Sequence, residues 1–178
     1  MGGLDGSAGL MLAASKRGGA SARAVAASGG FADARGLVAA LALGAQGINM
    51  GTRFCATREA PIHERVKEFL VNNDERATNL IFRKLHNTAR VAKNSVSDKV
   101  VEILSKPGAT FEDVAHLVRG ARGRELLESG NLDAGLVWAG QSQGLVHDIP
   151  SVAELIDRLI GEATAIITRR LAVMIDAG

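Results

Sequence analysis

Residues 24–30, AVAASGG, and residues 48–54, INMGTRF, are two short apolar runs that each end in glycine. Between them, residues 33–44 have the apolar spacing of a helix, and Asp33 stands where it can cap that helix. The order is therefore strand, loop, helix, strand, loop. An uninterrupted apolar run is typical of a parallel strand, so we expect residues 25–28 to be buried on both faces.

Both strand ends are rich in glycine, with Gly29 and Gly30 after the first strand and Gly51 after the second. Glycine lets the backbone come close to a ligand, and the amides of such loops bind anions. Two neighbouring parallel strands with loops of this kind are typical of the phosphate-binding corner of a β/α barrel. The alternative for the glycine pair is an ordinary turn in an αβ unit.

The continuous segment SGGFADARGLVAALALGAQGINMGTRF, residues 28–54, resembles the flavin phosphate-binding segment of the nitronate monooxygenase family, formerly called 2-nitropropane dioxygenases. Related flavin-dependent enoyl-ACP reductases carry a similar segment. The resemblance runs from about Ala26 to the C-terminus and includes IFRKLHNTARVAKN (81–94) and GLVHDIPSVAELIDRL (144–159). It implies an α/β fold that is the C-terminal part of a TIM-type barrel with a helical insert. A complete barrel takes about 250 residues, so 178 residues make an incomplete one.

The resemblance also implies a function, an FMN-dependent monooxygenase that oxidises alkyl nitronates with dioxygen. It places the FMN phosphate between the two glycine loops, which makes these residues candidates for cofactor binding: Gly29, Gly30, Asn49, Met50, Gly51 and Thr52. The loop after Trp138 resembles the family's C-terminal loop near the flavin ring, so Gly140 and Gln141 are further candidates. A simple turn between helices is the alternative for that loop. Arg53 either adds charge to the phosphate site or points outward to a carboxylate.

The catalytic residue is left unassigned. The family uses as its base a histidine in a glycine-rich loop ahead of the first glycine strand, and no histidine occurs here before His63. His147, which precedes Asp148, is expected to be structural, and His116 is expected at the surface. The sequence has no Cys/His spacing typical of a metal site.

Composition argues against several other functions. The net charge is +2 and aromatic residues make up 3%, without tyrosine, which gives little basis for binding nucleic acid by charge and stacking. The single cysteine, Cys55, cannot form an internal disulfide and suits a reducing cytoplasm. No apolar stretch reaches about 18 residues, so we expect no membrane span. We expect a cytoplasmic protein that acts on a small molecule and is able to form a homo-oligomer.

Four segments follow from these patterns: a glycine- and alanine-rich segment 1–25, the FMN phosphate-binding portion 26–60, a helical insert or lid 61–135, and a C-terminal loop with a long helix, 136–178. In the insert we expect a helix with Pro61 at its first position, a second helix over residues 78–85 and a further helix over residues 95–105. The basic residues around Asn87 form either a solvated face or a lid over an anionic substrate.

Apolar residues at helical spacing between Leu155 and Leu171 predict a last helix, and we expect its whole apolar stripe to be part of the core.

Three functional hypotheses remain open: a nitronate-oxidising flavoenzyme, an enoyl-ACP reductase-like flavoenzyme, and a truncated fragment of the family without catalytic activity.

Overall fold

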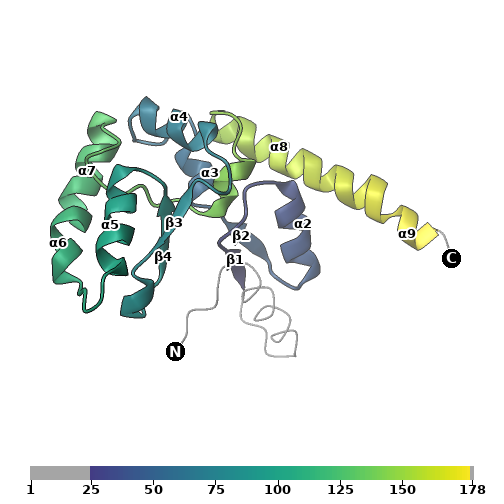
Figure 1. Ribbon diagram of the computed structural model, residues 1–178. Helices are drawn as coiled ribbons and strands as arrows, with labels where there is room; N and C mark the ends of the chain where they lie inside the picture. The colour runs from purple at the N-terminus through teal and green to yellow at the C-terminus, as the bar shows by residue number, and fades with distance from the viewer. Residues whose placement is uncertain (1–24, 177–178) are drawn as a thin grey trace.

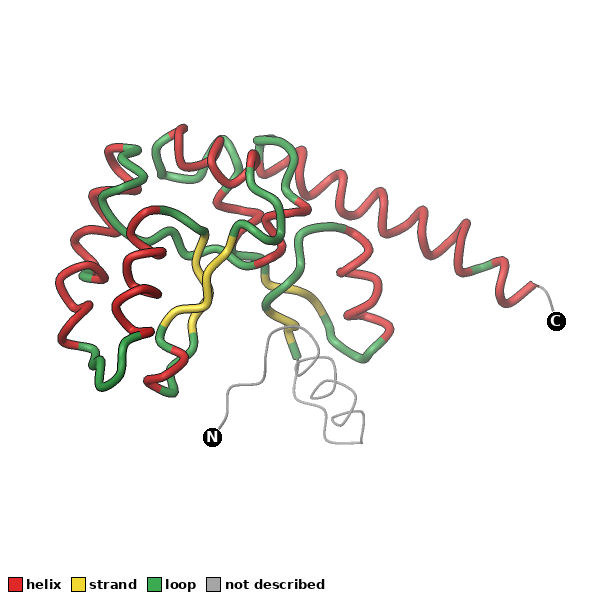
Figure 2. The backbone as a smooth tube through the Cα atoms, in the orientation of Figure 1, coloured by secondary structure: helices red, strands yellow, loops and turns green. Residues whose placement is uncertain are grey.

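The computed structural model describes residues 25–176, so the expectation for the first 24 residues lies outside the described part (Figures 1 and 2). Its elements follow in the order β1 (Ala26–Ser28), α2 (Ala34–Ala42), β2 (Gly47–Asn49), α3 (Thr52–Cys55), α4 (Glu64–Asn72), β3 (Thr78–Ile81), η1 (Arg83–Leu85), β4 (Ala89–Ala92), α5 (Ser95–Ser105), α6 (Glu112–Val118), α7 (Gly120–Ser129), η2 (Gln141–Leu145), α8 (Val152–Ala165), the π-helical turn η3 (Ile166–Leu171) and α9 (Val173–Asp176).

The β1–α2–β2 unit has the predicted order. β1 and β2 pair in parallel, with Ser28 opposite Asn49, and the Asp33 carboxylate accepts a hydrogen bond from the Gly36 amide at 3.1 Å to begin α2. Burial of β1 on both faces was a wrong expectation, because only Ala27 is buried in this strand. Ala27 lies in the core shared with α2 and α8, whereas Ala26 and Ser28, on the opposite face of the strand, are exposed, and within the described residues β1 pairs with β2 alone.

The insert differs from the prediction at two places. Residues 78–85 are not a helix: β3 pairs antiparallel with β4, and the left-handed residues Phe82 (φ 59°) and His86 (φ 54°) bound the short η1 turn between them. A short apolar run does not distinguish a strand from a buried helix turn, and here the pairing partner decides. Pro61 is not a first helical residue, because α4 begins at Glu64 and His63 caps it.

Other predicted elements are confirmed. α5 covers residues 95–105 as expected, and Asn94 caps its start: the side chains of Asn94 and Ser97 form a reciprocal capping box. The next helical stretch is divided at Arg119 into α6 and α7. α5 and α6 pack with the β3–β4 hairpin around a core of their own.

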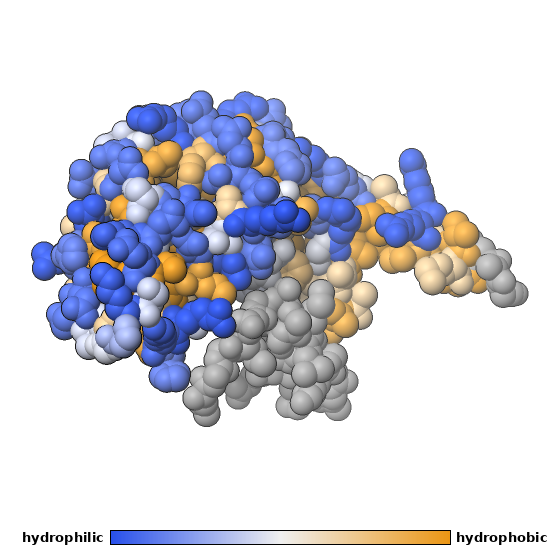
Figure 3. Space-filling model, in the orientation of Figure 1, coloured by the Kyte–Doolittle hydropathy of each residue, from blue (hydrophilic) through white to orange (hydrophobic). Residues whose placement is uncertain are grey.

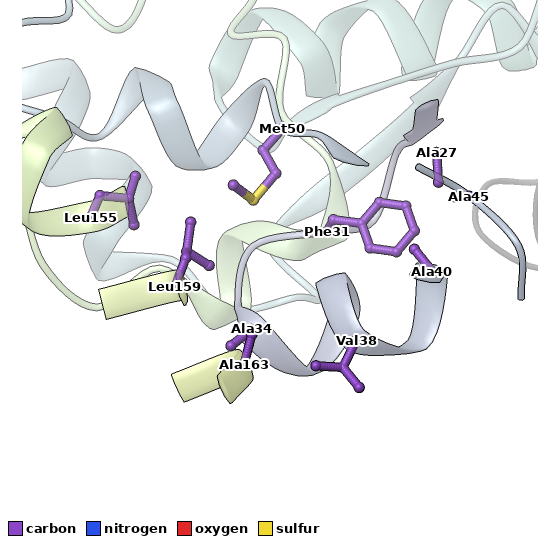
Figure 4. Close-up of a cluster of buried hydrophobic side chains, with 10 residues drawn as sticks. All are labelled: Ala27, Phe31, Ala34, Val38, Ala40, Ala45, Met50, Leu155, Leu159 and Ala163. Atoms are coloured by element: carbon purple, nitrogen blue, oxygen red, sulfur yellow. The ribbon is translucent and has the colours of Figure 1, made fainter. Parts of the chain in front are cut away.

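A separate apolar core joins the β1–α2–β2 unit to the last long helix (Figure 4). α8 packs against α2, and Leu155, Leu159 and Ala163 are the α8 side chains buried there. The expectation that the whole stripe of this helix is core was wrong, because Ile156 and Ile160 are exposed. Figure 1 gives the reason: α8 and α9 project beyond the rest of the chain, so one layer of α2 covers only one side of the helix.

Among residues 25–176, no helix is both long and apolar enough to cross a membrane.

Candidate functional site

The carboxyl ends of β1 and β2 bring the two glycine loops together. Because Ser28 lies opposite Asn49 in the parallel register, the loop that starts at Gly29 lies beside the loop that starts at Met50. A hydrogen bond of 3.3 Å from Asn49 Nδ2 to Ser28 Oγ links the last residues of the two strands. The side chain of Asn49 is thus turned toward β1, at the mouth of the loop pair.

The backbone of these loops is open to a ligand. Gly29 (φ 90°) and Gly30 (φ 81°) adopt left-handed conformations that strain other residues, and both are exposed. A Cβ atom placed on Gly51 would meet no protein atom within 4 Å, so space for a ligand remains above this residue. Within residues 25–176, the amides of Gly30, Gly51 and Thr52 have no backbone acceptor. Such amides are suited to bind an anion.

Met50 occupies this segment in a different way. Its side chain is buried in the core shared with Phe31, Leu155 and Leu159 (Figure 4). Of the candidate residues it can therefore offer a ligand only its backbone, while its side chain fixes the loop to α8.

The C-terminal loop meets the second glycine loop at Thr52. The Gly140 amide donates a hydrogen bond of 3.0 Å to Thr52 Oγ1, which joins two segments 88 residues apart in the chain. A hydroxyl that accepts one hydrogen bond still has its own proton to donate. Gln141 follows Gly140 at the start of η2 and is exposed. The candidates of the glycine loops and those of the C-terminal loop, Gly140 and Gln141, therefore lie next to each other.

Arg53 is already bound to a carboxylate of this chain. Its guanidinium is buried and hydrogen-bonds both the main-chain oxygen and the carboxylate of Asp148, at 3.1 and 2.9 Å. Arg158 reaches the other carboxylate oxygen of Asp148 at 2.8 Å. Burial lowers the pKa of Arg53, although the Asp148 charge opposes that shift. Of the two alternatives left by the sequence, the carboxylate partner is the one observed, although the guanidinium is buried and does not point outward to solvent.

Gln143 is a residue of the site region that sequence reasoning missed. It is fully buried, and its Nε2 donates hydrogen bonds of 2.8 Å to the main-chain oxygens of Asp74 and Ala77. These bonds fasten η2 to the turn before β3 in the insert. A glutamine in a glycine-rich loop gives no sequence signal for this role, because its acceptors lie more than 60 residues earlier.

The described histidines provide no clear base. His63 is used as the cap of α4, where its Nδ1 accepts a hydrogen bond from the Arg65 amide at 3.2 Å. His86, His116 and His147 are exposed, as expected for His116. The described part of the chain contains no group of three or more residues able to hold a metal ion.

Trp138, the only tryptophan of the chain, lies two residues before Gly140. It is 61% exposed. Its neighbours Val137 and Ala139 are buried, and Val137 accepts a hydrogen bond from Ala92 in β4. The exposed indole therefore stands on a segment whose backbone is held at both ends.

Most of the chain is similar to known proteins. The sequence model of the family described as nitronate monooxygenase matches residues 2–162. The chain belongs to this family. A nitronate monooxygenase of Paraburkholderia phytofirmans is 33% identical over 135 residues, which cover 76% of this chain and 36% of that protein. The family resemblance inferred from the sequence is confirmed.

Two further relatives belong to the same comparison. A (3aS,4S,5R,7aS)-5-hydroxy-7a-methyl-1-oxo-octahydro-1H-indene-4-carboxyl-CoA dehydrogenase of Rhodococcus jostii is 32% identical over 176 residues, covering 78% of this chain and 49% of that protein. The structure of FabK from Thermotoga maritima superposes with a TM-score of 0.81 at 29% identity, covering 92% of this chain and 51% of FabK.

These neighbours have TIM-type barrels, so the predicted α/β fold, a part of such a barrel, is confirmed. The chain spans about half, or less, of the length of the relatives it matches. The family is one of oxidoreductases.

Proposed function

We propose that this chain holds the FMN of a flavin-dependent oxidoreductase that oxidises alkyl nitronates with dioxygen. The observation that carries the proposal is the pair of glycine loops, side by side at the ends of β1 and β2, with amides that have no backbone acceptor among the described residues. Parallel strands that end in such loops are the usual phosphate corner of a barrel.

The donor set suits a phosphate group. A phosphate has several acceptor oxygens, and the amides of Gly30, Gly51 and Thr52 supply donors without a side chain that would need desolvation. The Thr52 hydroxyl adds one more donor, because Gly140 occupies it only as an acceptor. Arg53 is not needed there, since Asp148 already neutralises it.

The chemistry of oxidation resides in the flavin when it is bound, and the protein supplies binding, orientation and access. The residues of this chain hold the phosphate end, and Met50 anchors their loop to the core. Gly140 fixes the C-terminal loop against Thr52, and Gln143 fixes the same loop to the insert. In this proposal these bonds hold the insert beside the bound cofactor, where a lid would have to lie.

The nitronate substrate rests on the family and on the relative named nitronate monooxygenase. An enoyl-ACP reductase-like activity and a fragment without turnover remain the alternatives. Consumption of dioxygen by the FMN-loaded chain on addition of an alkyl nitronate distinguishes the proposed function from both alternatives. A chain that binds FMN and consumes no dioxygen corresponds to a binding portion without this activity.

The first prediction concerns Gly51. The Gly51→Asp variant adds a carboxylate where a phosphate is expected, in a place where a side chain meets no protein atom within 4 Å, so folding is preserved. Repulsion between like charges should weaken FMN binding by about tenfold or more, equal to about 1.4 kcal/mol. Riboflavin has the same ring without the phosphate, so its binding should change far less. Flavin fluorescence and Trp138 emission both follow the titration.

Gly120→Asp provides the matched control. Gly120 is exposed at the start of α7, and a Cβ atom there also meets nothing within 4 Å. This variant adds the same charge elsewhere and should bind FMN as the parent chain does. Equal loss of FMN and riboflavin binding in Gly51→Asp would refute a phosphate site, and a folded parent chain that binds no FMN would refute the proposed function itself.

A further inference from the structure

The segment between α7 and η2, residues 131–140, connects the insert to the glycine loops. On the insert side, the Ala92 amide of β4 donates a hydrogen bond of 2.8 Å to the main-chain oxygen of Val137. Asn94, the cap of α5, donates two more bonds of 2.8 Å to main-chain oxygens of the same segment. On the other side, the Gly140 amide donates to Thr52 Oγ1, and among the described residues this is the one hydrogen bond between the segment and the glycine loops.

Apolar packing makes this segment part of the insert. Leu136 is buried in the core of the hairpin with α5, and Val137 and Ala139 are buried in the core around α4. Among the described residues, the core of the β1–α2–β2 unit contains none of the segment. Figure 3 shows that the surface over α5, α6 and α7, at the left of the view, is mostly hydrophilic, as expected of a part with a core of its own. The bond between Gly140 and Thr52 is therefore a polar contact of the insert with the second glycine loop.

The Thr52 hydroxyl is able to serve two partners at once. Its oxygen accepts the bond from Gly140 at 3.0 Å, and its own proton has no acceptor within residues 25–176. The neighbouring Gly51 leaves open space, since a Cβ atom there would meet no protein atom within 4 Å. A phosphate oxygen in that space can accept the proton. Hydrogen bonds in a chain strengthen one another, so a hydroxyl that donates to an anion becomes a better acceptor for the Gly140 amide.

We propose that Thr52 is a positioning residue through which the flavin phosphate fixes the insert. This inference rests on the proposed function, because it needs the phosphate at the glycine loops. The phosphate accepts the proton of Thr52, which strengthens the bond from Gly140 and holds residues 131–140, and the insert with them, against the second glycine loop. Coupling between two sites is reciprocal, so a docked insert also tightens the binding of the phosphate.

Hydrogen exchange followed by mass spectrometry measures this coupling. Amides exchange when the structure around them opens, so a segment that is held more firmly exchanges more slowly. Saturating FMN should slow the exchange of residues 136–140 at least about fivefold, the lower end of the usual coupling between two sites. Riboflavin has the same ring without the phosphate, so at equal occupancy it should leave this exchange unchanged. Equilibrium dialysis of the same samples measures how much of each flavin is bound.

Substitutions of Thr52 separate the hydroxyl from the rest of the side chain. Thr52→Val keeps the shape and removes the hydroxyl, so saturating FMN should no longer slow the exchange of residues 136–140. Thr52→Ser keeps the hydroxyl and should restore the slowing seen in the parent chain. Thr88→Val is the matched control, because Thr88 is exposed in the turn between η1 and β4, and it should respond to FMN as the parent does. Circular dichroism confirms that the variants are folded.

The outcomes separate this inference from the proposed function. Bound FMN that leaves the exchange of residues 136–140 unchanged overturns the coupling and leaves the proposed function intact. Slowing by riboflavin equal to that by FMN overturns the role of the phosphate, and slowing in Thr52→Val equal to that in the parent overturns the role of the hydroxyl. A folded parent chain that binds no FMN in dialysis refutes the proposed function and this inference with it.

Discussion

One carboxylate, that of Asp33, fixes the start of α2 and with it the first glycine loop. The side chain accepts hydrogen bonds from the Gly36 amide and from Arg35. Replacing this cap, Asp33→Ala, should lower the free energy of unfolding by about 1 kcal/mol at pH 7. Chemical denaturation of the two proteins at pH 7 measures the difference.

The same residue predicts a pH dependence. Burial alone would raise the pKa of Asp33, but the hydrogen bonds from Arg35 and Gly36 outweigh it and the pKa is lowered. The unfolded-state value is about 3.9. Stability from this cap is therefore present above about pH 4 and is lost as the pH falls through the lower, folded-state pKa. A stability difference between parent and variant that stayed constant down to about pH 2 would contradict this.

Single residues also mark where the sequence was informative. The Asp33 cap was predictable, because capping is local and its acceptor and donor are three residues apart. The hydrogen bond between Gly140 and Thr52 was not, since it joins residues that only the fold brings together. The role of Arg53 remained open for the same reason: its partner, Asp148, is 95 residues away.

At the scale of elements, α8 separates two kinds of apolar residue that the sequence does not distinguish. Leu159 is buried against the β1–α2–β2 unit, and Ile160, its neighbour, is 56% exposed. Leu159→Ala should cost about 2–5 kcal/mol of stability because it leaves a cavity. Ile160→Ala should change the stability of the monomer by about 0.5 kcal/mol or less. Thermal unfolding of dilute samples compares the two.

Equal destabilisation by the two α8 variants would mean that the helix packs differently from the arrangement in Figure 4. Helical spacing predicted this helix correctly, but it cannot say which apolar residues meet a neighbour. The same limit explains the wrong prediction for residues 78–85, where pairing with β4 outweighs local pattern. Elements with local start and stop signals, such as α5, were predicted to the residue.

At the scale of the whole molecule, the Arg53–Asp148 pair ties the second glycine loop to the segment before α8. Asp148→Ala leaves the buried guanidinium of Arg53 without its carboxylate and should cost about 2–3 kcal/mol, less than a fully buried pair because Asp148 is partly exposed. Arg158→Ala removes a more exposed partner of the same carboxylate and should cost about 1 kcal/mol or less. Urea unfolding distinguishes the two, and equal costs would contradict a central role for Arg53.

The sequence correctly predicted the family and an α/β fold that is part of a barrel. The candidate residues of the cofactor site lie together, while their ligand and the cytoplasmic location stay predictions. The catalytic base stays unassigned, because no described histidine has a geometry that identifies it.

Cys55, the only thiol of the chain, ends the short helix that begins at Thr52. It is half-buried, and burial raises the pKa of its thiol, so the reactive thiolate is scarce at neutral pH. Reaction with a thiol reagent then reports how often this helix opens to solvent. The rate at which Cys55 reacts thus reports the mobility of the second glycine loop. A ligand that holds Thr52 in place would slow this reaction.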